Sequence, residues 1–256
     1  MTAPGRPVVL FCVPYAGGSA GVYRRWQESF GHGVEVVPVG AARRTAGDPG
    51  DPAHGVGRAA EELVRAVRER AAGRPYLLFG HSMGSLVAYE AARRTRQLGL
   101  AAPRLVVVSG RNPPHLHGHW AAEVLDLPDR QLLARLDAVG GVPEGLSPSL
   151  ASTFFLPLLR ADLRSALSYR PEEPPARLDA PMLVLAGRDD PLVRPEALTG
   201  WARYTSGPFT LRQHEGGHFA LFGRVPELVV TLRPWTGPAA AGREAAAPVR
   251  AGGGGR

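Results

Sequence analysis

The sequence predicts an α/β fold built on a mostly parallel, doubly wound sheet. Short runs rich in Val and Leu recur along its 256 residues, and they are continuously apolar, as expected for strands covered on both faces. Segments with helical spacing separate these runs and supply the crossover connections that parallel strands need. The composition, 44% hydrophobic, suits one domain with a sizeable core.

The predicted strands and helices alternate from the first apolar run to the last. Most of the strands are short Val- and Leu-rich stretches, and the helix at 57–73 ends at a glycine, a common stop signal. The expected strands lie at 6–14, 34–39, 76–79, 104–110, 181–187 and 209–215, and the expected helices at 20–30, 57–73, 85–97, 195–205 and 226–235.

One stretch interrupts this alternation. Between the predicted strands at 104–110 and 181–187, the sequence has helical spacing at 129–139 and 150–169 but no run that predicts a strand. An insertion after a strand lies beyond the carboxyl end of the sheet, where binding loops of such folds gather. We therefore expect a helical lid insertion at about 111–180.

The composition also bears on domains, location and partners. We expect one domain over 1–235 and a disordered tail over 236–256, because the tail has few large apolar side chains. Neither a membrane-spanning run nor a secretory signal stands out, which predicts a cytoplasmic protein without a membrane partner. The net charge is +7, but the arginines are not interleaved with stacking aromatics, so we expect no nucleic-acid partner. No long exposed apolar stripe is evident, and we expect a monomer.

The motif GHSMG at 80–84 places Ser82 between a predicted strand and a predicted helix. Glycines two positions before and after a serine permit the sharp turn that lifts its hydroxyl clear of the backbone. A serine hydroxyl is a poor nucleophile until a base removes its proton. The motif therefore predicts a catalytic serine in an α/β-hydrolase fold, with a structural turn as the alternative.

In that fold an acid and then a histidine follow the serine along the chain. The acid should come just after a late strand, where Asp189 and Asp190 compete; we favour Asp190 and regard Asp189 as a solvated or turn-capping carboxylate. The histidine should lie in a loop after the last strand. His218 follows two glycines that permit a tight loop, whereas His214 falls within the predicted strand, so we expect His218 to be the base.

Backbone amides should stabilise the oxyanion of such a site. Met83 begins the helix after the serine, and its N–H would donate to an oxyanion. The glycine-rich segment after the first strand should supply a second donor, for which we favour Ala16, with Gly17 next. Histidines alternate in HLHGHW at 115–120, but no carboxylate or thiol completes a metal site, so we expect none.

Together these segments resemble the type II thioesterases that serve polyketide and nonribosomal peptide synthetases. The resemblance spans about residues 7–235. It departs after the second predicted strand, where the family usually has a Pro-Gly-Arg turn and this chain has Gly40 and Arg43 without that triplet. The segments that carry it are PYAGGSAGVYRRW, GHSMGSLVAYE, LPDRQLLARLDAVGGVP, FLPLLRADLRSALSY, LAGRDDPLV and WARYTSGPFTLRQHEGGHFALF.

The resemblance implies hydrolysis of acyl thioesters from the phosphopantetheine arm of acyl or peptidyl carrier proteins, without a metal or redox cofactor. Carrier proteins are usually acidic, which would suit the positive charge of this chain. The alternatives are a general carboxylesterase or lipase-like hydrolase, an acyl-transferring or cyclising thioesterase, and a carrier-binding module without catalysis. In the lid, Asp162 should anchor the insertion through an arginine or a helix end. Four side chains should line the acyl pocket or pack the lid on the core: Phe154, Phe155, Leu158 and Leu159.

Overall fold

The chain folds around a six-stranded parallel sheet with strand order β2-β1-β3-β4-β5-β6. The computed structural model describes residues 6–40, 55–116 and 119–237. Arg43, His117 and most of the expected tail, at 238–256, lie outside them. The strands confirm the predicted α/β fold: β1 (Val8–Val13), β2 (Val34–Pro38), β3 (Tyr76–His81), β4 (Leu105–Ser109), β5 (Met182–Gly187) and β6 (Phe209–His214).

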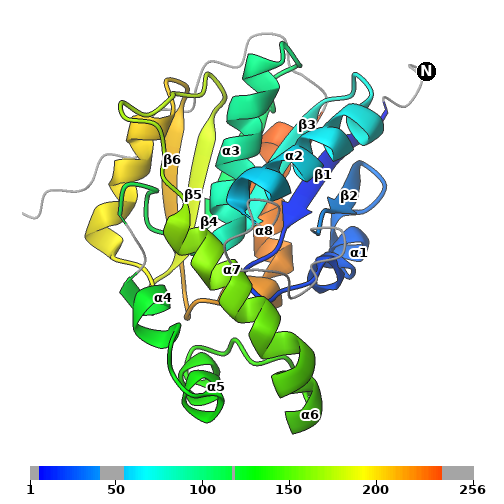
Figure 1. Ribbon diagram of the computed structural model, residues 1–256. Coiled ribbons are helices and arrows are strands. Elements are labelled where there is room, and N and C mark those ends of the chain that lie inside the picture. The colour runs from blue at the N-terminus through cyan, green and yellow to red at the C-terminus, as the bar shows by residue number, and fades with distance from the viewer. Residues whose placement is uncertain (1–5, 41–54, 117–118, 238–256) are drawn as a thin grey trace, which may run out of the picture.

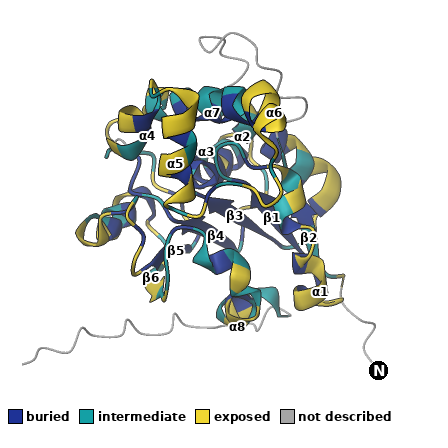
Figure 2. Ribbon diagram, turned by 90° about the horizontal axis from the view of Figure 1, so that it is seen from below, coloured by how far each residue is buried: buried dark blue, intermediate teal, exposed yellow. Residues whose placement is uncertain are grey.

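Apolar side chains leave the central strands toward both faces of the sheet. In β1, Val9 and Phe11 join the core beneath α2 (Val56–Ala66) and α3 (Met83–Gln97). Leu10 and Cys12 point the other way, as strand pleating requires, and pack toward α1 (Trp26–Phe30) and α8 (Val225–Thr236). Figure 2 shows these two helix pairs on opposite sides of the buried sheet. Coverage on both faces explains why the strands are continuous apolar runs.

Two predicted helices differ from what the sequence indicated. The expected helix at 20–30 is divided into a 3₁₀ turn, η1 (Ala20–Tyr23), and the short α1. The expected helix at 195–205 is the 3₁₀ segment η5 (Pro195–Tyr204), which contains Gly200. Glycine is a poor α-helix former, which disfavours a regular α-helix there. The remaining short elements are η3 (Val67–Ala71), a π-helical turn that continues α2, and η6 (Ala220–Gly223), a 3₁₀ turn.

All the regular elements between β4 and β5 are helices, and the described residues of this segment contain no strand. These helices bury an apolar cluster of their own beside the main core. They gather beyond the carboxyl ends of the strands, and α7 returns across the α3 side of the sheet (Figure 1). The elements are α4 (His119–Val124), α5 (Asp129–Asp137), α6 (Pro148–Leu150), the π-helical η4 (Ala151–Phe155) and α7 (Leu156–Ser168).

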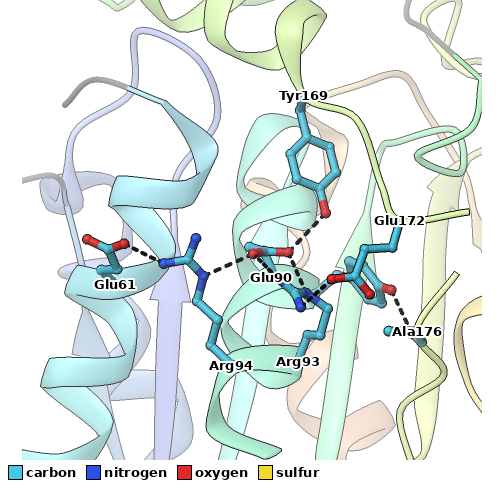
Figure 3. A network of polar contacts seen from close by, with 8 residues as sticks. Glu61, Glu90, Arg93, Arg94, Tyr169, Glu172 and Ala176 are labelled. Carbon is cyan, nitrogen blue, oxygen red and sulfur yellow. Dashed lines mark hydrogen bonds and ion pairs between the residues drawn. The ribbon is translucent and has the colours of Figure 1, made fainter. Parts of the chain in front are cut away.

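A buried carboxylate on α3 joins this helix to the chain that follows α7 (Figure 3). Glu90 accepts hydrogen bonds from Arg93 at 2.7 and 3.0 Å, from Arg94 at 2.9 Å and from the Tyr169 hydroxyl at 3.2 Å. Burial raises the pKa of Glu90, but the hydrogen bonds from the two guanidinium groups outweigh burial and lower it. The two arginines continue outward to Glu172 and Glu61.

None of the helices in the described ranges combines the length and the apolar character that a membrane span requires.

Candidate active site

Ser82 occupies a strained turn between β3 and α3. Its φ of 53° and ψ of −117° lie outside the regions that side chains other than glycine normally adopt. The turn is crowded on both sides. A Cβ on Gly80 would come within 2.0 Å of the Gly84 carbonyl oxygen, and a Cβ on Gly84 within 2.4 Å of the Val13 oxygen. Both glycines are therefore required by backbone packing, as a sharp strand-to-helix elbow demands.

Hydrogen bonds to the end of β4 hold the elbow in place. The Ser82 N–H donates to the Ser109 carbonyl oxygen at 2.7 Å. The buried Ser85 hydroxyl oxygen lies 3.0 Å from the carbonyl oxygens of Gly80 and Ser109, and it accepts the Ser109 N–H at 3.0 Å. These contacts fix the backbone strain of residue 82. Sequence reasoning did not single out Ser85 or Ser109, because only the fold brings β4 beside the elbow.

The residues predicted as acid and base, Asp190 and His218, come from two different loops and meet each other. His218 Nδ1 lies 2.8 Å from Asp190 Oδ2, and both side chains are buried. The other carboxylate oxygen, Oδ1, accepts the Leu192 N–H at 2.9 Å. Asp189 is exposed, and its backbone N–H donates to the Gly216 oxygen. An ion-pairing carboxylate at Nδ1 leaves Nε2 of His218 to exchange protons with a reacting group.

Gly110, which follows β4, leaves space for the imidazole ring of His218. Gly110 has a φ of +60°, and a Cβ there would come 2.7 Å from His81 Cε1 and 3.1 Å from His218 Cε1. His81 lies beside the base, with ring centroids 4.8 Å apart, and its Nδ1 is 3.0 Å from the Ser109 hydroxyl oxygen. Burial, followed by the charges of His218 and His214, lowers the pKa of His81 well below its usual value. A neutral His81 spares the site a second cation when His218 is protonated.

The two expected oxyanion donors lie at the ends of the first and third strands. The N–H of Met83, the first residue of α3, and the N–H of Ala16 donate to no acceptor among residues 6–40, 55–116 and 119–237. Gly17, the second choice for this role, instead donates its N–H to Asp162 Oδ2 at 2.7 Å. The buried Asp162 thus binds the amide of a loop that faces it from β1, where the sequence suggested an arginine or a helix end.

Ser82, His218 and Ala16 line one cavity between the sheet and the helices of 119–168. Of the four expected pocket residues, Leu159 lines it, and Phe155 packs in the cluster of the helical insertion. Leu158 is half-buried and Phe154 is 67% exposed, and neither lines the cavity. Apolar spacing within α4, α5 and α7 was the sequence signal for Trp120, Ala121, Leu136 and Leu163. The remaining lining is Tyr15, Gly110, Arg111, Asn112, Trp120, Ala121, Leu136, Val139, Leu163, Leu192 and Phe219.

Two other histidines that the sequence drew attention to, His214 and His115, do not line this cavity. His214 ends β6, and its Nδ1 lies 3.1 Å from the Glu215 carbonyl oxygen. His115 is 3.0 Å from the Tyr204 hydroxyl and stacks on that ring. Within the described part of the chain, no group of three His, Cys, Asp or Glu side chains is arranged to hold a metal ion.

Comparisons with known proteins agree with this geometry. The sequence profile of the thioesterase domain matches residues 9–236. Thioesterase PikA5 of Streptomyces venezuelae is 36% identical over 220 residues, which cover 86% of this chain and 77% of that protein. RedJ, a thioesterase from the prodiginine pathway of Streptomyces coelicolor, superposes with a TM-score of 0.76 at 36% identity, covering 90% and 91% of the two chains.

A second solved structure gives the same picture. BorB, described as the type II thioesterase of the borrelidin biosynthetic cluster, superposes with a TM-score of 0.76 at 31% identity, over 91% of this chain and 94% of its own. The profile match, the curated relative and the structural neighbours all name the same activity, and they extend over nearly all of the sheet and the helical insertion. The chain belongs to the thioesterase family.

Proposed function

We propose that this protein is a type II, editing thioesterase. It hydrolyses acyl thioesters from the phosphopantetheine arm of acyl or peptidyl carrier proteins in polyketide or nonribosomal peptide biosynthesis. One observation carries the proposal: a strained serine elbow and a buried histidine–aspartate pair line the same cavity. The similarity to the type II thioesterase BorB supports the substrate class.

In the proposed acylation step, Ser82 Oγ attacks the thioester carbonyl carbon while His218 takes the hydroxyl proton. Asp190 holds the imidazole in the required tautomer and stabilises the imidazolium. The carbonyl oxygen becomes an oxyanion, which the N–H groups of Met83 and Ala16 stabilise. When the tetrahedral adduct collapses, the carbon–sulfur bond breaks and the thiol leaves with the proton from His218. Each oxyanion donor contributes about 3 kcal/mol to lowering the barrier.

Deacylation repeats the same steps with water as the nucleophile. His218 removes a proton from water, the water oxygen attacks the acyl carbon, and the oxyanion again rests against the two amides. Collapse releases the carboxylic acid, and the proton returns to Ser82 Oγ. The helices within 111–180 serve as a lid in this proposal, because their side chains form one wall of the cavity.

The proposed protein substrate also gives the positive charge a role. The net charge of +7 favours association with an acidic carrier. We further propose that the enzyme acts in the cytoplasm, as a monomer that visits its carriers. The exposed large apolar side chains in the described ranges are few, and they are spread over α3, the α6–η4 segment and α8: Leu98, Leu150, Phe154 and Val230.

The direct test is acyl release from a panel of acyl-loaded carrier proteins, followed by intact mass spectrometry. We expect free carrier and free acid, and loss of turnover in Ser82→Ala with an unchanged melting temperature. A matched pair of substrates, an acyl-pantetheine thioester and the corresponding oxygen ester, separates this enzyme from a general esterase. A decisive preference for the oxygen ester would contradict the proposal, and a transferred or cyclic product would assign the chain to the acyl-transferring or cyclising thioesterases.

A further inference from the structure

The backbone aims Arg111 at the catalytic cavity. It follows Gly110, the glycine that makes room for His218, at the carboxyl end of β4. Its carbonyl oxygen accepts the indole N–H of the fully buried Trp201 at 2.9 Å, which fixes the start of the loop. The Arg111 side chain then lines the same cavity as Ser82 and His218. A cation therefore lies in the wall of the chamber that would receive the acyl group.

This guanidinium has no partner within residues 6–40, 55–116 and 119–237. Nε is fully buried and makes no hydrogen bond there, and the side chain makes no ion pair. Among the described residues, the cavity lining contains neither Asp nor Glu. Asp190, which lies behind His218, already directs its two oxygens to His218 and to the Leu192 N–H. Burial lowers the pKa of Arg111 to about 10, which still leaves it charged at neutral pH.

Arg111 is half-buried, and its Nε is fully buried. A charged group that is partly withdrawn from water and has no partner is poorly solvated, so a hydrogen-bond acceptor on a ligand stabilises it more than it would a fully hydrated cation. The planar guanidinium matches oxygen acceptors, above all carbonyl and carboxylate groups. The largely apolar side chains of the lining suit an alkyl chain: Trp120, Leu136, Val139, Leu159 and Leu163.

We propose that Arg111 is a specificity-determining residue, which donates hydrogen bonds to an oxygen acceptor on the acyl chain beyond the thioester carbonyl. The enzyme would then favour oxygenated acyl groups, 3-oxoacyl or carboxyacyl, over plain alkyl acyl groups of similar length. This inference rests on the proposed thioesterase function. An acceptor that all substrates share, such as a pantetheine amide oxygen, is the competing partner for Arg111, and it would affect every acyl group equally.

The test compares kcat/KM of the wild type and Arg111→Met on three pantetheine thioesters: butyryl, 3-oxobutyryl and malonyl. We expect the ratio of an oxygenated substrate to butyryl to fall by about tenfold or more in the variant, the effect of losing a hydrogen bond to a charged group. A fall for malonyl alone identifies a carboxylate acceptor, and a fall for 3-oxobutyryl alone a neutral carbonyl. Arg203→Met, at an exposed arginine paired with Glu173, is the matched control and should leave the ratio unchanged.

Equal losses on all three substrates, or an unchanged ratio, would overturn the inference. Arg111→Lys keeps the charge but loses the planar fork, and we expect its ratio to lie between those of the wild type and Arg111→Met. A melting curve shows whether Arg111→Met folds. If it does not fold, Arg111→Lys takes its place in the comparison of substrate ratios. Failure of the wild type to hydrolyse any of the three thioesters would count against the proposed function itself, so the two outcomes are distinguishable.

Discussion

Two charged groups on neighbouring elements, the buried Glu90 and the half-buried Arg111, have opposite surroundings. On α3, Glu90 is surrounded by Arg93, Arg94 and Tyr169, and the arginines pair further with exposed carboxylates. At the end of β4, Arg111 lines the catalytic cavity, and its Nε makes no hydrogen bond within the described residues. The protein itself pairs the charge of Glu90, whereas the charge of Arg111 is available to a ligand in the cavity.

The same contrast separates the middle of α3 from its amino end. Around Glu90, halfway along the helix, polar atoms are paired in a network that ties the helix to the chain after α7 (Figure 3). At the amino end, the N–H of Met83 and the neighbouring N–H of Ala16 have no acceptor in the described ranges. Groups that stabilise a fold must be satisfied within it, whereas groups that stabilise a transition state must be available when it forms. Stability and rate should therefore respond to different substitutions.

The largest expected effect is on the rate, at the buried acid. Asp190→Asn should lower kcat by about 10³- to 10⁴-fold, because the amide no longer stabilises the imidazolium or its tautomer. Asp189→Asn is the matched control, since that carboxylate is exposed, and it should retain most of the activity. Steady-state kinetics on one acyl-pantetheine thioester measures both. The opposite ranking would assign the catalytic acid to Asp189, and the 2.8 Å contact between Asp190 and His218 would then have no catalytic function.

The next effect is on stability, at the paired carboxylate in the middle of α3. Glu90→Ala should lower the free energy of unfolding by about 2 kcal/mol, because two guanidinium groups and a hydroxyl lose a buried acceptor. Glu172→Ala, at a carboxylate with 57% side-chain exposure, should cost less than about 1 kcal/mol. Urea unfolding measures both variants. A large loss of kcat in folded Glu90→Ala would contradict the claim that Glu90 affects stability and not the catalytic rate.

The pH dependence of the Glu90 contribution follows from its lowered pKa. A carboxyl group whose folded-state pKa is depressed stabilises the protein above the unfolded-state value and loses that contribution as the pH falls through the folded-state value. The stability difference between the wild type and Glu90→Gln should therefore be full near pH 7 and shrink on acidification below about pH 4.

A smaller effect on the rate should follow from Asp162, which joins α7 to the loop that carries Ala16. Its carboxylate accepts the Gly17 N–H at 2.7 Å, so it positions the adjoining amide without touching the reacting atoms itself. Asp162→Asn should lower kcat about tenfold with little change in KM, a fraction of the loss of a whole oxyanion donor. Asp129→Asn, on an exposed carboxylate bound to Arg160, is the control. A purely structural role would instead lower the melting temperature and leave kcat of the folded enzyme intact.

The smallest effect should have the opposite sign. Arg111→Met should raise the free energy of unfolding by about 1 kcal/mol, because it removes a half-buried charge that has no ion-pair partner in the described residues. The folded-state pKa of about 10 lies below the unfolded value of 12.5, so the cost of the charge is present at neutral pH and is relieved only as the pH rises above 10. Destabilisation of this variant near pH 7 would show that Arg111 has a structural partner, and the comparison with Glu90 would fail.

Much of this molecule was predictable because its signals are local. Short apolar runs indicated most of the strands, all six strands were predicted, and GHSMG indicated the elbow at Ser82. What was missed depends on contacts between segments distant in sequence. The bond from Asp162 to Gly17 spans 145 positions, and only the fold shows that it occupies the second-choice oxyanion amide. Likewise, Arg111 gave no signal in the sequence, because its importance lies in the partners that its surroundings do not supply.

The central claim is that Ser82 becomes covalently acylated with the help of His218, and the most direct measurement is to trap that bond. The protein is treated with a fluorophosphonate, digested and mapped by mass spectrometry. We expect one adduct, on the peptide that contains Ser82, with labelling strongly slowed in His218→Ala and absent in Ser82→Ala. An adduct on a different residue, or full thioesterase activity after complete labelling of Ser82, would contradict the account.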